Sequence, residues 1–361
     1  MKAAVFHGAH TPLTIEDVEI AEPIGHEVRM RTVASGVCHS DLHFVDGFYP
    51  FPTPAILGHE AAGIVESVGP HVTEFKPGDH VIACLSIFCG HCSYCLTGRT
   101  YLCNARPDRA SQDPPKLTWK GAPVNQFVGL SAYAEQMLVH ENGLVKVHDD
   151  MPLDRAALIG CGVTTGVGAV LNTARVEPGA TVAVFGAGGV GLAAIQGARI
   201  AGAGMIIAVD VFAHKLTQAQ ELGATHAVDA SKDDPVKAIR RLTGGGVEYA
   251  FEAIGLKKAA EQAFECIRPG GTATIIGMIP VGQKIELEGS VFLREKRIQG
   301  CTMGSNRFKV DMPKYVDFYQ RGLLRLDEMI SKRGRLGDVN EAFRAMKAGE
   351  VARTVLMFDA Q

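Results

Sequence analysis

The sequence has little net charge and no basic run. Its 361 residues include 36 lysines and arginines against 39 aspartates and glutamates, for a formal net charge of -3 at pH 7. Nucleic acids and other polyanions attract proteins through clustered positive charge. We therefore expect no nucleic-acid partner. The length allows two domains, each large enough to bury its own core.

The sequence also lacks a convincing membrane segment, an internal repeat or a low-complexity tract. The apolar run at Met1–His7 is too short for a signal peptide. Only Pro178–Ala198 is uncharged for long enough to raise the question of a membrane span. Its many glycines fit a buried strand, a turn and a helix better, so we expect no membrane partner.

Cysteine is the residue type whose spacing is most informative. Four of the nine cysteines stand close together, at Cys89, Cys92, Cys95 and Cys103. Thiolates separated by two residues can wrap one tetrahedral zinc ion, and such a four-sulfur site is closed and performs no chemistry. The spacing predicts a structural zinc site in preference to a disulfide cluster.

The cysteines outside the metal sites give no convincing disulfide framework. They are Cys84, Cys266 and Cys301, once Cys38 and Cys161 are assigned below. Unpaired thiols persist in reducing compartments. We expect a cytoplasmic protein.

The first 150 residues are expected to be rich in β-structure. Short apolar runs at Ala3–Phe6, Glu27–Ser35, Gly63–Val68 and Asp79–Ala83 are separated by proline and glycine. This pattern predicts a small, irregular antiparallel barrel or sandwich. The polar segment Arg106–Gln126 is predicted to be an exposed loop.

From about Val176, strand-like and helical runs alternate. The expected strands are Thr181–Phe185, Ile206–Val209, Val247–Phe251 and Thr272–Ile276. The expected helices are Val190–Ala201, Phe212–Glu221 and Lys257–Cys266. Alternation of this kind predicts an α/β fold with a doubly wound parallel sheet. The tail returns to helices, Asp311–Arg321 and Asp338–Ala348, and a last strand, Thr354–Phe358.

A glycine-rich turn stands between the first strand and the first helix of this alternating region. It has the pattern G-x-G-x-x-G and comprises Gly186, Ala187, Gly188, Gly189, Val190 and Gly191. Glycines there allow the backbone to approach a pyrophosphate, whose charge faces the helix N-terminus. Asp210 ends the next strand, where a carboxylate would bind the adenosine ribose hydroxyls and repel a 2′-phosphate. We expect NAD in preference to NADP, with Lys215 close enough to help hold the ribose or else exposed to solvent as an ordinary helix charge.

A second group of metal-ligating residues lies apart from the four cysteines. Cys38, His39, Ser40, Asp41 and His43 stand within six residues of one another. The tripeptide Gly58-His59-Glu60 and the isolated Cys161 add an imidazole, a carboxylate and a thiol. Any three of these groups could give the open coordination of a catalytic zinc, although each alone is more commonly a core or surface residue.

Taken together, these motifs resemble those of the zinc-dependent alcohol dehydrogenases of the medium-chain dehydrogenase/reductase superfamily. The resemblance covers essentially the whole chain, including Ile254-Gly255 and Arg353-Thr354-Val355-Leu356. It implies a GroES-like catalytic domain over residues 1–156, with the zinc lobe, completed by residues 302–361. It also implies a NAD-binding Rossmann domain over residues 157–301.

The resemblance assigns roles to individual residues. Cys38, His59 and Cys161 would bind the catalytic zinc, with Glu60 behind the metal and Asp41 orienting the imidazole of His59. The alcohol would lose its proton through Ser40 and the coenzyme ribose to His43, and a hydride to the nicotinamide. The further coenzyme contacts implied are His39, Arg353, Thr165 and Ile254.

The resemblance also implies a substrate pocket and an assembly. The pocket would be lined by Leu85, Phe127, Val128, Met278 and Ile279, which favours a hydrophobic primary alcohol, aliphatic or aromatic. The strand Arg297–Gly300 would pair with a second copy, giving a homodimer or homotetramer.

Two alternatives stay open at this point. One is a dehydrogenase of a formaldehyde-thiol adduct, for which Asp46 and Arg106 or Arg109 would have to serve at the pocket mouth. The other is a non-catalytic nucleotide-binding relative, which the complete set Cys38, His59 and Cys161 disfavours.

Overall fold

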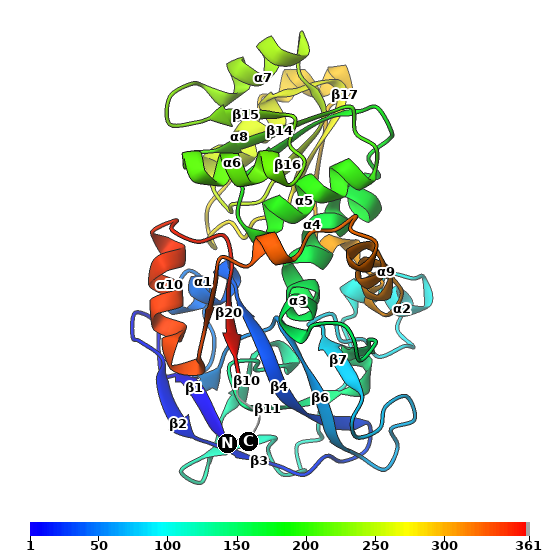
Figure 1. The fold of residues 1–361 in the computed structure, drawn as a ribbon, viewed down its shortest axis with the longest axis vertical. Coiled ribbons are helices and arrows are strands. Elements are labelled where there is room, and N and C mark those ends of the chain that lie inside the picture. Colours follow the sequence, from blue (N-terminus) through cyan, green and yellow to red (C-terminus); the bar gives the residue numbers. More distant parts are fainter. Residues whose placement is uncertain (359–361) are drawn as a thin grey trace. The chain divides into compact units, whose positions relative to one another are not determined.

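The chain forms two compact units in the computed structural model, which describes residues 1–358 (Figure 1). The first unit comprises residues 1–161, 307–322 and the chain from residue 326 onward, and the second comprises 162–306 and 323–325. The boundary between the first and second units therefore lies after Cys161, and not after residue 156 as predicted. The chain returns to the first unit after Asn306 instead of after residue 301.

The first unit is built mainly of antiparallel strands. Its strands are β1 (Lys2–Phe6), β2 (Thr14–Asp17), β3 (Glu19–Ile20), β4 (Glu27–Val37), β5 (Ala55–Ile56), β6 (Ala61–Val68), β7 (His80–Ala83), β8 (Leu117–Trp119), β9 (Ala122–Pro123), β10 (Asn125–Gln126), β11 (Gln136–His140), β12 (Leu144–Lys146), β19 (Lys332–Gly334) and β20 (Thr354–Met357). Its helices are α1 (His39–Val45), α2 (Ser93–Leu96), α3 (Leu153–Leu158), α9 (Phe308–Gln320) and α10 (Val339–Lys347).

Strand β4 organises the first unit. It pairs antiparallel with β6, β11 and β20, within a seven-stranded sheet. Smaller sheets, β10-β5-β1-β2 and β3-β8-β9, complete the unit. The apolar residues of these strands form two buried clusters, one around Phe6, Ile56 and Tyr133 and one around Met30, Val65 and Leu130. The end of β4 at Val37 places the metal-ligating residues that follow it directly beside this core.

The second unit is a parallel six-stranded sheet with the strand order β15-β14-β13-β16-β17-β18 (Figure 1). Its strands are β13 (Thr181–Phe185), β14 (Met205–Asp210), β15 (His226–Asp229), β16 (Val247–Glu252), β17 (Ile267–Ile275) and β18 (Arg297–Gly300). Helices α5 (Gly189–Ile200), α6 (Ala213–Glu221), α7 (Pro235–Thr243) and α8 (Lys257–Glu265) connect the first five strands. The strand order reverses between β13 and β16, which is where doubly wound sheets bind their ligands.

The sequence patterns did not predict every element of the second unit. Strand β15 and helix α7 are additional, although α7 has clear end signals: the Asp234 side chain caps it, Pro235 begins it and Gly244 in a left-handed conformation ends it. The glycine-rich stretch Pro178–Ala198 does form a buried strand, a turn and a helix, as expected.

One helical run, Leu153–Ala174, has the length and apolar composition of a membrane span, with a mean hydropathy of 1.4. Most of it, 83% of the apolar stretch, is buried inside the protein. Core helices pass the same test, so this run is weak evidence for a membrane. The sequence patterns did not predict a helix here.

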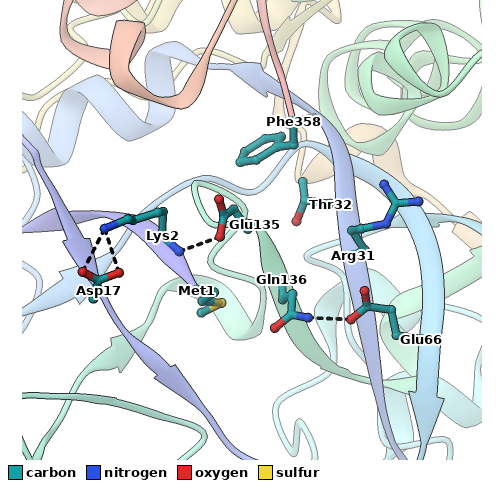
Figure 2. A pocket seen from close by; sticks show the side chains of 9 residues that line it. All are labelled: Met1, Lys2, Asp17, Arg31, Thr32, Glu66, Glu135, Gln136 and Phe358. Carbon is teal, nitrogen blue, oxygen red and sulfur yellow. Dashed lines mark hydrogen bonds and ion pairs between the residues drawn. The ribbon is translucent and has the colours of Figure 1, made fainter. Parts of the chain in front are cut away.

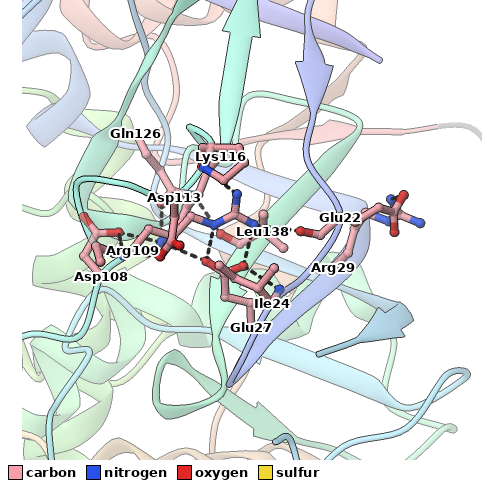
Figure 3. A network of polar contacts seen from close by, with 12 residues as sticks. Glu22, Ile24, Glu27, Arg29, Asp108, Arg109, Asp113, Lys116, Gln126 and Leu138 are labelled. Carbon is pink, nitrogen blue, oxygen red and sulfur yellow. Dashed lines mark hydrogen bonds and ion pairs between the residues drawn. The ribbon is translucent and has the colours of Figure 1, made fainter. Parts of the chain in front are cut away.

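The prediction that Arg106–Gln126 is an exposed loop is wrong for its key residues (Figure 3). Arg109 donates from Nε and Nη2 to the two carboxylate oxygens of Glu27, at 2.8 and 2.6 Å, and both side chains are 7% exposed. Lys116 lies between Asp108, at 2.9 Å, and Gln126, at 3.4 Å. A buried bidentate pair is strong because water cannot screen it, and it holds this segment against the start of β4.

Candidate active site and metal centres

Three predicted ligands meet in the core of the first unit. The ligand atoms of Cys38, His59 and Cys161 all lie within 4.8 Å of one another. These three residues are 5%, 1% and 5% exposed. Cys38 directly follows β4, His59 follows β5, and Cys161 lies in a π-helical turn, Ile159–Val163 (η4). Two thiols and an imidazole buried together fit a zinc ion with an open fourth position.

Asp41 orients the imidazole of this group. The Nδ1 atom of His59 lies 3.0 Å from Oδ1 of Asp41, which also accepts the backbone N–H of Gly58 at 3.0 Å. The hydroxyl of Tyr133 donates to Oδ2 at 2.8 Å. Because Nδ1–H donates to the carboxylate, Nε2 keeps its lone pair for a metal. Tyr133 was not predicted, and nothing in its sequence surroundings marks it.

Glu60 and Arg353 form a buried pair next to the ligands. Nη2 of Arg353 lies 3.6 Å from Oε2 of Glu60, and Nη1 donates to the carbonyl of Val37 at 3.1 Å. A Cβ at position 36 would stand 2.1 Å from Oε1 of Glu60, so only Gly36 leaves room for this carboxylate. The guanidinium was expected to reach the coenzyme pyrophosphate, and that role stays a prediction.

The two thiols of the buried group differ in acidity. A hydrogen bond from Cys161 lowers the pKa of Cys38 well below its usual value against the effect of burial, and the nearby His59 and Arg353 act in the same direction. The same hydrogen bond, together with burial, raises the pKa of Cys161. Cys38 is therefore the first of the two to ionise, and a metal must displace the proton of Cys161.

Helix α1 presents the residues expected to move the proton. Ser40 lies on its first turn, with Oγ 3.7 Å from Sγ of Cys38. His43 follows three residues later and is half-buried, and burial lowers its pKa. His39 is exposed, with its ring 6.3 Å from that of His43.

The four cysteines predicted to bind the structural zinc also lie close together. The sulfurs of Cys89, Cys92, Cys95 and Cys103 lie within 4.8 Å of one another. The backbone N–H groups of His91 and Cys92 donate to Sγ of Cys89, and the N–H of Cys89 donates to Sγ of Cys103. The N–H of Cys95 lowers the pKa of Cys92 to about 6, whereas desolvation raises that of Cys95 to about 12. Four convergent sulfurs with N–H support fit a structural zinc.

Replacing Cys92 with serine tests the lobe. We expect zinc content to fall from two ions per chain to one and the melting temperature to drop, because a structural zinc contributes directly to folding free energy. Metal analysis and calorimetry measure the two quantities. Ser93→Ala, one residue away and without a ligand sulfur, should change neither. Full stability after loss of one zinc would contradict the structural role.

The glycine turn adopts the conformation expected for a pyrophosphate site. Gly186 has φ +93°, and a Cβ at Gly191 would stand 1.7 Å from the carbonyl oxygen of Gly186. Gly188 is the N-cap of α5, and the helix itself begins at Gly189 and Val190. Asp210 ends β14, and its Oδ2 accepts the N–H of Ala187 in the turn at 2.8 Å. The carboxylate predicted to bind the ribose is thus hydrogen-bonded directly to the turn.

The remaining predicted coenzyme residues lie on the second unit. Lys215 on α6 has Nζ 4.9 Å from the centre of the Phe212 ring. Thr165 is 7% exposed and donates to the sulfur of Met303 at 3.3 Å. Ile254 is 40% exposed, in the loop after β16. Their contacts with a coenzyme stay predictions.

Replacing Asp210 with glycine and Val211 with arginine should shift coenzyme preference toward NADP by about tenfold or more, because the repulsion of the 2′-phosphate is removed. Affinity for NAD should also fall, since Ala187 loses its hydrogen-bond acceptor. The ratio of kcat/KM for the two coenzymes measures the shift. Asp229→Asn, at the matching position of β15, is the control. A wild-type preference for NADP would overturn the role of Asp210.

The predicted pocket residues fall in both units. Phe127 and Val128 belong to the first unit and pack with Phe44 and Phe51. Leu85, also of the first unit, packs on the neighbouring apolar cluster. Met278 and Ile279 lie in the second unit, after β17. Phe44 and Phe51 were not predicted, although the aromatic-rich stretch from Phe44 to Phe51 was a visible signal.

A separate polar pocket of about 410 Å³ lies in the first unit (Figure 2). Several of its polar groups pair with one another: Nζ of Lys2 with Asp17 at 2.8 Å, the N–H of Lys2 with Glu135 at 2.7 Å, and Gln136 with Glu66 at 2.6 Å. None of its lining residues is a predicted site residue or belongs to a metal-ligand group. We do not assign it to the active site.

Comparison with known proteins agrees with the fold and with a zinc-dependent enzyme. Residues 25–149 match the alcohol dehydrogenase GroES-like domain and residues 189–321 match the zinc-binding dehydrogenase domain. The class-3 alcohol dehydrogenases of Myxine glutinosa and Pisum sativum are 42% and 40% identical to this chain, each over 98% of it and 97% of the relative. The crystal structure of benzyl alcohol dehydrogenase from Acinetobacter calcoaceticus is 34% identical, covers 99% of both chains and has a TM-score of 0.93.

A closed zinc lobe, an open ligand set and a dinucleotide-binding sheet define an oxidoreductase that uses zinc and a nicotinamide coenzyme. With the relatives above, the chain belongs to the zinc-dependent alcohol dehydrogenases of the medium-chain dehydrogenase/reductase superfamily. Its cofactors are zinc and NAD, and the two ligand groups fit two zinc ions. The expected GroES-like and Rossmann-type fold is confirmed, and the non-catalytic alternative is set aside.

Proposed function

We propose that the protein oxidises primary, hydrophobic alcohols to aldehydes with NAD and catalyses the reverse reduction. The observation that carries the proposal is an aromatic cluster beside a zinc ligand. The ring of Phe127 lies 6.0 Å from that of His59, and the rings of Phe44 and Phe51 lie 4.9 and 5.2 Å from Phe127. Edge-on aromatic packing excludes water and favours apolar or aromatic groups. Similarity to a benzyl alcohol dehydrogenase supports this substrate class.

The backbone next to this cluster is strained. Val128 has φ 46° and ψ 28°, a left-handed conformation that is unusual for a β-branched residue. Ser131 holds the segment by accepting the N–H of Phe127 at 2.9 Å and donating to the carbonyl of Ile56 at 2.8 Å. Strain of this kind persists where the surrounding structure over-determines it, commonly at functional sites. It supports a substrate-binding role for Phe127 and Val128.

When bound, the zinc held by Cys38, His59 and Cys161 would supply Lewis acidity and NAD would accept the hydride. The protein's own part in this proposal is to hold the ligands, orient His59 through Asp41 and move a proton. In this proposal Ser40 takes the alcohol's proton, which its hydroxyl beside the ligand group supports. The proton then passes through the coenzyme ribose to His43, whose pKa is lowered by burial, so that the neutral imidazole is favoured.

The coenzyme roles of the other predicted residues belong to the same proposal. Asp210 would bind the adenosine ribose with help from Lys215, and His39 and Arg353 would approach the pyrophosphate. Thr165 would lie beside the nicotinamide and Ile254 would contact the coenzyme, while Met278 and Ile279 would add apolar surface for the substrate. The compartment stays a prediction as well, and the cysteine usage favours the cytoplasm.

A series of linear, branched and benzylic alcohols with NAD tests the substrate class. We expect kcat/KM to rise with the apolar surface of the alcohol, because each buried methylene contributes roughly 0.8 kcal/mol of binding. Phe127→Ala should reduce the gain, whereas Phe292→Ala, an exposed phenylalanine outside the cluster, should not. A flat or falling series would contradict the proposal.

The same series should include a formaldehyde-thiol adduct. Asp46 is already paired with Lys347 at 2.9 Å, and one of the two candidate arginines, Arg109, is paired with Glu27 at 2.6 Å. The adduct would then depend on Arg106, and the ion pair of Asp46 counts against it. Turnover of the adduct above that of every alcohol would reverse the order of the two candidates.

His43→Gln tests the proton path. The variant should keep its full zinc content and oxidise alcohols more slowly by about a hundredfold in the transient rate, since it lacks a general base. The lowered pKa of His43 means that its neutral form persists below the ordinary histidine value. The deficit should therefore already be present below the ordinary histidine pKa, persist to neutrality and shrink at high pH, where bulk water accepts the proton more readily.

Stopped-flow rates against pH, together with metal analysis, measure these effects, and His148→Gln on an exposed loop is the control. Loss of zinc would show that His43 is a metal ligand, and unchanged rates at every pH would show that it has no part in proton transfer.

We also propose that β18 pairs with its counterpart in a second copy. It is the outer strand of the six-stranded sheet and is partly exposed. Unpaired edge strands are templates for association. Light scattering at micromolar concentration should give a homodimer or homotetramer, and a monomer would contradict the pairing.

A further inference from the structure

A carboxylate stands at the end of the helix that carries the predicted proton acceptor. Helix α1 ends at Val45, Asp46 is its C-cap, and His43 lies in its last turn. Residues three positions apart on a helix are neighbours. The helix dipole opposes a negative charge at this end, where it favours cations. The dipole therefore does not account for Asp46.

A second helix supplies a cation. Helices α1 and α10 lie side by side in the first unit (Figure 1), and Lys347 is in the last turn of α10. Its Nζ lies 3.0 Å from Oδ1 and 2.9 Å from Oδ2 of Asp46. The side chain of Asp46 is 22% exposed and that of Lys347 is 65% exposed. The carboxylate is therefore partly shielded from water, and Lys347 offsets its charge.

The imidazole of His43 responds to this charge. Burial lowers the pKa of His43, whereas the negative charges of Cys38 and Asp46 act in the opposite direction. The thiolate of Cys38 would be bound to zinc, which offsets its charge. The carboxylate of Asp46 then needs a cation of its own.

The other groups around the ring of His43 do not supply that cation permanently. The ring centres of His39, Phe48 and Tyr49 lie 6.3, 5.7 and 6.0 Å from that of His43. Burial raises the pKa of Tyr49, which keeps its phenol neutral. His39 is charged only when protonated, so Lys347 is the group that balances Asp46 at neutral pH.

We propose that Lys347 is a positioning residue for the proton path: it holds the carboxylate of Asp46 and offsets its charge, which leaves the imidazole of His43 free to accept a proton. The inference rests on the proton path proposed above. Without Lys347, the carboxylate would hold a proton on His43 more strongly, and a protonated imidazole cannot act as a base. Because Lys347 acts through Asp46, its effect should vanish when residue 46 is uncharged.

Nuclear magnetic resonance titration of His43 in the zinc-loaded enzyme measures this coupling without turnover. Lys347→Met should raise the pKa of His43 by about half a unit, the size expected of a partly exposed ion pair. Asp46→Asn should lower the pKa, and adding Lys347→Met to it should cause no further change. Arg344→Met is the matched control, because Arg344 lies in the same last turn of α10 and pairs with other carboxylates. It should leave the pKa of His43 unchanged.

Stopped-flow rates against pH separate this role from a structural one. Lys347→Met should slow alcohol oxidation by about twofold below the ordinary histidine pKa, because fewer molecules hold a neutral imidazole. It should not slow the reaction at high pH, whereas a loss of stability would lower the rate at every pH.

An unchanged pKa of His43 in Lys347→Met, or an equal rise in the Asp46→Asn background, would overturn the role of Lys347 alone. A raised pKa with unchanged rates would overturn the proton path itself, and the role of Lys347 with it.

Discussion

The arrangement of the metal-ligating residues in the first unit depends on the hydrogen bonds that the carboxylate of Asp41 accepts. This carboxylate is fully buried and joins three parts of the chain: its own helix α1, the backbone and imidazole of Gly58 and His59, and the hydroxyl of Tyr133. Gly58 has φ +88°, and a Cβ there would stand 2.7 Å from Tyr133. The close approach that brings Tyr133 to Asp41 thus requires a glycine beside the ligand. One carboxylate fixes both the tautomer of His59 and the packing around it.

Charge balance explains why the neighbouring ionisable groups are buried together. Beside the Asp41 carboxylate, ionised Cys38, Cys161 and Glu60 would carry three further negative charges, which a zinc ion and Arg353 would offset with three positive charges. Buried charges are tolerated only when paired and hydrogen-bonded. Arg353 meets both conditions through Glu60 and the carbonyl of Val37. A bound zinc ion would thus offset buried negative charge in the core in addition to its part in the chemistry.

The sequence was most informative where a function depends on neighbours along the chain. The four-cysteine lobe and the glycine turn are each defined by residues at short spacings along the chain, so both could be predicted from the sequence alone. Tyr133 and the pair Glu27–Arg109 could not, because their partners lie far away in sequence and meet only in the folded chain. Helix α7 is a different case. Asp234, Pro235 and Gly244 are helix end signals that the sequence contains, but the prediction from alternating strands and helices did not use them. The first unit boundary, after Cys161, falls inside the helical run Leu153–Ala174, which the sequence patterns did not predict.

The position of Cys161 shows how local helix geometry serves the site. A regular α-helix places side chains at fixed intervals of 3.6 residues. The wider π-helical turn Ile159–Val163 changes that interval just at the ligand, and such turns are rare and are frequently found at functional sites. A Cβ at position 160 would stand 2.8 Å from the carbonyl oxygen of Ala83, so Gly160 lets the widened turn pack against β7. Glycine inside a helix costs about 1 kcal/mol relative to alanine. That cost is offset when a zinc ion bound by Cys161 closes the ligand set with Cys38 and His59.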